Sequence, residues 1–189
     1  MNHLKKYDII LGSASPRRKE LLKGLDIEFR IMANNVDETF PPEMSNVEIP
    51  MYLAQKKADA YKLNENTLLI TADTIVWLDG RVYGKPTDRS DAYEMLKMLS
   101  GKIHQVITGV CIKTAEKNTV FHAITDVHFA CFSDAEIEYY LDHYSPYDKA
   151  GSYGVQEWIG YIGVEHIEGS YFNVMGLPVQ QLYNELKNW

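Results

Sequence analysis

Apolar residues along this chain follow two patterns, continuous runs typical of buried strands and a period of three to four residues typical of helices. The longest apolar run, 67–78, is rich in β-branched residues and predicts a central strand. An Asp-Gly turn at 79–80 predicts that this strand folds back as a hairpin. The other predicted strands cover 7–11, 28–32, 105–114, 119–132 and 159–167, and the predicted helices cover 16–23, 47–62, 90–99, 134–143 and 179–186.

This mixture of strands and helices predicts an α/β fold. The chain has 189 residues, of which 46% are hydrophobic, enough to bury a sizeable core. We see no internal repeat, low-complexity tract or linker. We therefore expect a single domain over residues 1–189.

Charge, hydropathy and cysteine content limit the binding partners and the cellular compartment that we expect for this protein. The net charge of −7 argues against non-specific binding to nucleic acid or to an anionic membrane, because both need a basic face. No apolar run approaches the roughly 20 residues of a membrane span, and the start lacks a secretory leader pattern. Cys111 and Cys131 lie in strand-like runs and form no Cys-x-x-Cys pair, which predicts buried thiols and a cytoplasmic protein.

The stretch 11–18 predicts a strand, a tight turn and the start of a helix. Ser15 is placed to cap the helix, Pro16 suits its first position, and Gly24 is placed to end it. With Ser13 and two arginines, this helix start is suited to bind an anion, phosphate above all. Capping alone explains the serine and the proline equally well, and the stretch matches neither familiar glycine-rich nucleotide loop. The stretch by itself leaves both interpretations open.

Charged residues further along the chain favour the phosphate interpretation. Asp73 interrupts the most apolar strand, where a carboxylate needs a pairing group or a bound cation. Lys57 follows Leu53 by one helical turn, so it lies nearer the apolar face than its neighbours. With Glu38 and Lys85, these residues supply the cations and carboxylates that phosphoryl chemistry uses. Asp73 can act there as a proton acceptor or as a metal ligand, and the residues alone do not decide between these roles.

Six motifs occur in order along nearly the whole chain. They are Ser13-Ala14-Ser15-Pro16-Arg17-Arg18; Ala72-Asp73-Thr74-Ile75-Val76; Gly84-Lys85-Pro86; Leu99-Ser100-Gly101 with His104, Val106 and Thr108-Gly109-Val110; Asp148-Lys149-Ala150-Gly151-Ser152-Tyr153-Gly154-Val155-Gln156; and Gly169-Ser170-Tyr171 with Gly176-Leu177-Pro178. Together they resemble the successive motifs of the Maf family, the septum-formation-inhibitor-like nucleotide pyrophosphatases.

The resemblance implies a fold similar to that of the inosine-triphosphate pyrophosphatases, an elongated mixed sheet with flanking helices in two lobes around a cleft. It also implies hydrolysis of a nucleoside triphosphate to the monophosphate and pyrophosphate. A divalent cation, Mg, Mn or Co, is the implied cofactor, and a homodimer is the implied assembly.

The resemblance also implies roles for individual residues. Asp73 corresponds to the proton acceptor for the attacking water, and Glu38 would join it in holding the metal. The polyphosphate would be bound by Ser13, Arg17, Lys57 and Lys85. The second arginine of the first motif, Arg18, is expected to be structural.

Three positions resemble the pyrimidine-specific group of the family: Arg17, Thr74 and Gln156. They imply dTTP and UTP as substrates, with modified pyrimidine triphosphates as candidates for a house-cleaning role. The segment 157–161 is bulkier than the family pattern after the glutamine. Two alternatives are a hydrolase for non-standard purine triphosphates and a non-catalytic regulator of septation.

Overall fold

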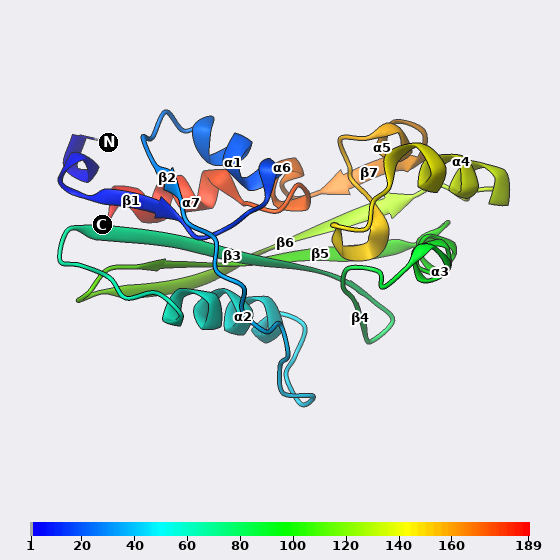
Figure 1. Cartoon of the computed structure of the whole chain (residues 1–189). Helices are drawn as coiled ribbons and strands as arrows, with labels where there is room; N and C mark the ends of the chain where they lie inside the picture. The colour runs from blue at the N-terminus through cyan, green and yellow to red at the C-terminus, as the bar shows by residue number, and fades with distance from the viewer. Residues whose placement is uncertain (1) are drawn as a thin grey trace. The chain divides into compact units, whose positions relative to one another are not determined.

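Strands and helices alternate along most of the chain in the computed structural model, which describes residues 2–189 (Figure 1). The strands are β1 (Asp8–Leu11), β2 (Arg30–Ile31), β3 (Thr67–Leu78), β4 (Arg81–Tyr83), β5 (Ile103–Lys113), β6 (Asn118–Phe129) and β7 (Val164–Glu168). The α-helices are α1 (Pro16–Lys23), α2 (Glu48–Asp59), α3 (Arg89–Leu99), α4 (Asp134–Tyr144), α5 (Trp158–Gly163), α6 (Tyr171–Val174) and α7 (Val179–Lys187), and the short 3-10 helices are η1 (Asn2–Lys6) and η2 (Ala150–Ser152).

The seven strands belong to one mixed sheet. Adjacent strands of the sheet follow the order β2-β1-β3-β5-β6-β7. The short strand β4 lies outside this order and pairs with β3. β1 runs parallel to both β2 and β3, whereas the pairs β3–β4 and β6–β7 are antiparallel. The predicted fold class, a mixed α/β sheet with flanking helices, is confirmed.

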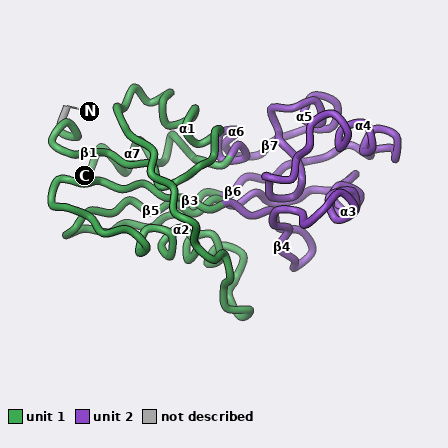
Figure 2. The backbone as a smooth tube through the Cα atoms, viewed as in Figure 1, with its two compact units in different colours: residues 1–73, 108–123, 176–189 green, residues 74–107, 124–175 purple. Residues whose placement is uncertain are grey.

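The chain divides into two compact units, each assembled from separated stretches (Figure 2). Unit 1 comprises residues 1–73, 108–123 and 176–189, and unit 2 comprises residues 74–107 and 124–175. Strands β3, β5 and β6 each contribute residues to both units. The expectation of a single domain stays a prediction.

In unit 1, helices α1 and α7 lie on one side of the strands and α2 lies on the other (Figure 1). Ala54 and Ala58 of α2 pack in a buried cluster with Ile10, Leu69 and Cys111 from three strands. The helix approaches the sheet closely at Gly109 on β5, where a Cβ atom would stand 2.3 Å from the carbonyl carbon of Pro50. Only glycine fits there, so Gly109 sets how near α2 approaches the sheet.

In unit 2, the predicted strand over 159–167 is wrong in its first half. Residues 158–163 form helix α5, and only then does the chain enter β7. Ile159 is buried at one turn's spacing from Gly163, whereas Tyr161 is 85% exposed. A Cβ atom on Gly160 would stand 1.9 Å from the carbonyl oxygen of Val155, so this helix depends on a glycine that packs directly on a preceding turn.

Elsewhere the predicted elements match the structure closely. The central strand covers 67–78 as predicted, and Ser15 caps α1 by accepting a hydrogen bond from the backbone N–H of Arg18 at 3.4 Å. The predicted strand over 28–32 shortens to the two residues of β2. Both cysteines are free thiols, but Cys131 is exposed and was wrongly predicted to be buried.

A neutral histidine is enclosed in the core of unit 2. His104 on β5 is 1% exposed, and its Nε2 atom lies 2.7 Å from the hydroxyl of Tyr153. Its ring meets that of Phe129 edge to face, with centroids 4.7 Å apart. Burial, together with the charge of nearby His128, lowers the pKa of His104 from 6.5 to about 3. The folded protein therefore keeps this ring uncharged at pH values where an unfolded chain protonates it.

We predict that His104 makes the fold acid-sensitive. Because its pKa is lower in the folded state, stability is unaffected above pH 6.5 and falls as the pH drops from 6.5 toward 3. The loss at pH 5 is about 2 kcal/mol. Urea unfolding at pH 7 and at pH 5 measures this loss as a difference in the free energy of unfolding. Between these two pH values, the His104→Gln variant should lose about 2 kcal/mol less than the wild type. His166→Gln, at an exposed position, is the control; an equal pH dependence in all three proteins contradicts the prediction.

Candidate active site

The turn between β1 and α1 places a serine hydroxyl beside the helix start. The Oγ atom of Ser13 accepts a hydrogen bond from the backbone N–H of Ser15 at 3.2 Å and one from Nη1 of Arg18 at 3.5 Å. A hydroxyl that accepts two hydrogen bonds still has its own proton to donate. The half-buried Arg17 stands at the second position of the same helix. The predicted phosphate-binding residues Ser13 and Arg17 thus lie at one helix N-terminus.

Arg18 ties this helix start to two distant parts of unit 1. Its Nη1 donates to the carbonyl of Ala72 at 2.8 Å, and its Nε donates to the carbonyl of Gly176 at 2.8 Å. Burial lowers the pKa of its guanidinium, and the charge of Asp73 acts in the opposite sense. These contacts fit the structural role expected for Arg18.

Asp73 lies within β3 and is 7% exposed. Two residues earlier on the strand, Thr71 donates from its hydroxyl to the carbonyl of Ala54 on α2 at 2.7 Å. This bond fixes the helix against the strand one turn before Lys57. Burial raises the pKa of the Asp73 carboxyl, and the cations of Lys57 and Arg18 oppose that rise.

Lys57 joins the two carboxylates that were predicted to hold a metal. Its Nζ lies 2.5 Å from Oδ1 of Asp73 and 2.8 Å from Oε1 of Glu38. These two oxygens are therefore no farther apart than the sum of the two distances. Lys57 is more buried than its neighbour Lys56, which bonds Asp37 and the carbonyl of Thr39 instead. The helical spacing from Leu53 favoured Lys57 over Lys56, and Lys57 is the lysine that reaches Asp73, while its role in binding stays a prediction.

The carboxylates of Glu38 and Asp73 are chemically suited to a divalent cation. Both present hard oxygen donors toward one positive charge, the donor type that Mg²⁺ and Mn²⁺ prefer. Within residues 2–189, no group of three or more His, Cys, Asp or Glu side chains is placed to hold a metal ion. The residues present thus offer two protein ligands.

The other predicted site residues belong to unit 2. Thr74 follows Asp73 directly on β3, and the exposed Lys85 follows β4. Next to Lys85, the carbonyl of Gly84 accepts a hydrogen bond from the N–H of Gly151 at 3.0 Å. That bond joins the Lys85 loop to the segment that leads to Gln156.

Three residues around Gln156 were not singled out from the sequence as functional. Glu157 accepts a hydrogen bond from the hydroxyl of Tyr140 and pairs with Nζ of Lys149 at 3.1 Å. A lysine in a loop motif gives no sign of being buried, and Tyr140 shares the apolar stripe of α4 with Ile137. No sequence pattern marks such a contact.

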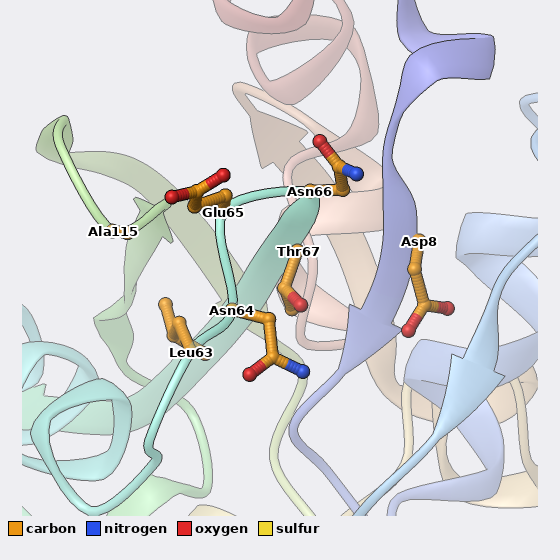
Figure 3. A pocket seen from close by; sticks show the side chains of 7 residues that line it. All are labelled: Asp8, Leu63, Asn64, Glu65, Asn66, Thr67 and Ala115. Atoms are coloured by element: carbon orange, nitrogen blue, oxygen red, sulfur yellow. The ribbon is translucent and has the colours of Figure 1, made fainter.

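A hollow of about 560 Å³ lies at the beginning of β3. Figure 3 shows the side chains that line it. Asp73 lies six residues further along the strand, a distance of roughly 20 Å. The hollow contains none of the predicted site residues and is lined by Asp8, Leu63, Asn64, Glu65, Asn66, Thr67 and Ala115. It is therefore separate from the arrangement around Asp73.

A family model described as Maf-like protein matches residues 8–189. The chain belongs to the Maf-like protein family. The resemblance inferred from the six motifs is thereby confirmed, and it extends over nearly the whole chain.

Curated relatives of this Maf-like chain match it over its full length. A protein named dTTP/UTP pyrophosphatase from Parabacteroides distasonis is 57% identical over 192 residues, covering 100% of both chains. A protein of the same name from Phocaeicola vulgatus is 58% identical over 190 residues, covering 99% of this chain and 98% of the relative.

Solved structures share the fold at low sequence identity. A HAM1 protein from Coxiella burnetii superimposes with a TM-score of 0.51 at 16% identity, over 97% of this chain and 100% of that one. The Ham1 protein of Staphylococcus aureus gives a TM-score of 0.52 at 15% identity, over 94% and 99%. These likenesses concern the fold alone. None of the helices described for the Maf-like chain has the length and apolar character needed to cross a bilayer.

We predict that replacing Arg18 lowers the stability of the protein, whereas replacing Arg17 weakens phosphate binding. Arg18→Ala removes hydrogen bonds from a half-buried cation to two carbonyls, so the free energy of unfolding should fall by about 2–4 kcal/mol in urea titrations. Arg17→Ala should weaken the binding of inorganic tripolyphosphate about tenfold or more by calorimetry, since a charged contact is lost. Lys19→Ala, exposed on the same helix, is the control. The reverse order of the two effects would remove this assignment.

Proposed function

We propose that this protein hydrolyses dTTP and UTP between the α and β phosphates, releasing the nucleoside monophosphate and pyrophosphate. The observation that carries the proposal is a buried carboxylate, Asp73, paired with Lys57 in a chain 57% identical over its full length to a named dTTP/UTP pyrophosphatase. Modified pyrimidine triphosphates are further candidate substrates.

Asp73 is proposed to accept a proton from the attacking water. A carboxylate whose pKa is raised by burial is a better proton acceptor near neutral pH than an exposed one. Lys57 holds the Asp73 oxygen in place and keeps the buried charge compensated. No protein nucleophile is required, because catalysis of this kind rests on positioning and on stabilising the charge of the phosphates.

The polyphosphate is proposed to contact Ser13, Arg17, Lys57 and Lys85. The hydroxyl of Ser13 donates to a phosphate oxygen, and Arg17 offers a planar pair of N–H groups that matches two such oxygens. Lysine supplies a point charge on a long stem, which follows the phosphate chain as its charge moves toward the leaving group. Glu38 with Asp73 would hold a divalent cation, Mg, Mn or Co, which when bound neutralises phosphate charge and lowers the pKa of water.

Substrate choice is proposed to depend on Arg17, Thr74 and Gln156. The amide of Gln156 offers both a donor and an acceptor, which suits the edge of a pyrimidine ring. A homodimer and a cytoplasmic location remain predictions that accompany this function.

Asp73→Asn should strongly reduce this activity without unfolding the protein. Asparagine keeps the shape of the side chain but accepts protons poorly, so kcat should fall about 10²–10⁴-fold. The measurement is pyrophosphate release from dTTP and UTP with Mg²⁺, Mn²⁺ or Co²⁺, alongside thermal unfolding. Asp26→Asn, an exposed position of unit 1 with a left-handed backbone that asparagine tolerates, is the matched control.

Three other results would favour a different function for the protein. A preference for ITP or 7-methyl-GTP over dTTP and UTP would contradict the pyrimidine specificity. Absence of pyrophosphate release by the wild type from any triphosphate would contradict hydrolysis itself. A septation phenotype that persists in the Asp73→Asn variant would support a regulatory role instead of turnover.

A further inference from the structure

The segment that carries Gln156 is a tight turn whose two ends are joined by a hydrogen bond. The backbone N–H of Glu157 donates to the carbonyl of Gly154 at 2.9 Å, which makes 154–157 a turn with Gln156 near its tip. A turn of this kind positions a side chain only when its own ends are fixed. The surrounding contacts of unit 2 supply that restraint.

The carboxylate of Glu157 is held by two buried groups. One oxygen accepts a hydrogen bond from the hydroxyl of Tyr140, and the other lies 3.1 Å from Nζ of Lys149. Tyr140 is completely buried, and the Lys149 side chain is 9% exposed. A buried ammonium needs a compensating charge, so Glu157 and Lys149 stabilise each other's burial. Asp148 also pairs with Lys149, at 2.8 Å, from a more exposed position.

The Tyr140 hydroxyl links the two ends of the turn. It donates to Glu157 and accepts a hydrogen bond from the N–H of Gly154 at 3.0 Å. Burial, together with the Glu157 charge, raises the pKa of Tyr140, so the hydroxyl keeps its proton and stays a donor. One side chain thus fixes the first and last residues of the turn.

Close packing leaves the turn little freedom. A Cβ atom on Gly154 would stand 2.7 Å from Cδ of Glu157 and 3.1 Å from Nε2 of Gln156. The side chains of Gln156 and Glu157 therefore lie over the bare backbone of Gly154. The Glu157 carboxylate and the Gln156 amide thus share the space over one glycine.

The Gln156 amide presents an acceptor without a partner in the described part of the chain. Its Oε1 atom is shielded from solvent, and no residue in 2–189 donates a hydrogen bond to it. A buried acceptor left unpaired costs free energy, which a ligand N–H would recover. Uracil and thymine carry an N3–H donor, whereas the N3 atom of cytosine is an acceptor.

We propose that Glu157, held by Tyr140 and Lys149, is a positioning residue that fixes the Gln156 amide to accept the N3–H of uracil or thymine. This role rests on the proposed function and explains how the same site would distinguish uracil and thymine from cytosine. Glu157 acts through Gln156 and does not itself touch the substrate. Its loss should therefore relax the discrimination between dTTP and dCTP.

Glu157→Gln keeps the shape of the side chain and removes the more buried of the two carboxylate charges that compensate Lys149. We expect kcat/KM for dTTP to fall about tenfold, through KM more than kcat, because ground-state binding is lost. The ratio of kcat/KM for dTTP over dCTP should fall with it. Tyr140→Phe, which removes only the hydroxyl, should change this ratio in the same direction. Glu165→Gln, an exposed glutamate of unit 2, should leave it unchanged.

A double-mutant cycle separates positioning from general stabilisation. If Glu157 acts through the amide, Glu157→Gln adds no further loss of discrimination to Gln156→Ala. Additive losses, or an equal fall for dTTP and dCTP in the single variant, overturn the proposal. If Glu157→Gln does not fold, the same cycle with Tyr140→Phe gives the answer.

The binding of uridine 5′-(α,β-imido)triphosphate by calorimetry supplies a readout independent of turnover. The affinity of Glu157→Gln for this analogue should fall about tenfold, with no change for tripolyphosphate. Wild-type protein that releases no pyrophosphate contradicts the proposed function. Wild-type protein that is active and discriminating, beside a Glu157→Gln variant of unchanged ratio, contradicts only this inference.

Discussion

The ion pair of Lys57 and Asp73 is the interaction on which the rest of the site depends. A carboxylate in the most apolar strand of the chain is tolerated because an ammonium reaches it at 2.5 Å. That reach requires α2 to lie close to the sheet, which the bond from Thr71 to Ala54 and the bare backbone of Gly109 allow. Fold and chemistry are therefore coupled here, since the packing of one helix decides whether Asp73 can remain charged.

A second set of restraints surrounds the turn at Gln156 in unit 2. Both regions follow the same physical rule, in which a buried charge is compensated by a partner on a different element. Around Asp73 the partner is a helix lysine, and around Glu157 it is a loop lysine assisted by a helix tyrosine. In each arrangement, these contacts hold a carboxylate, that of Asp73 or that of Glu157, in one position.

The sequence predicted the parts of this structure that depend on local pattern. The strand at 67–78 was found to the residue because its apolar run is long and β-branched, and Lys57 was selected by helical spacing. Helix α5 was missed because its apolar run suits a strand equally well, and the close approach of Gly160 to Val155 is visible only in the folded chain. The bond from Arg18 to Gly176 spans 158 residues, a separation that no local pattern encodes.

The division of β3 after Asp73 has a consequence for how such enzymes can diversify. Asp73 is the last residue of one compact unit in that strand, and Thr74 opens the other, which also contains Gln156. Under the proposed roles, two of the three specificity residues, Thr74 and Gln156, belong to the second unit, so mutations there can change which base is accepted while Asp73, Lys57 and Glu38 stay unchanged. Chimaeras that exchange only residues 124–175 between relatives would then replace the base-reading position 156 and its surroundings, and would keep Arg17, Thr74 and the hydrolytic residues of the parent chain.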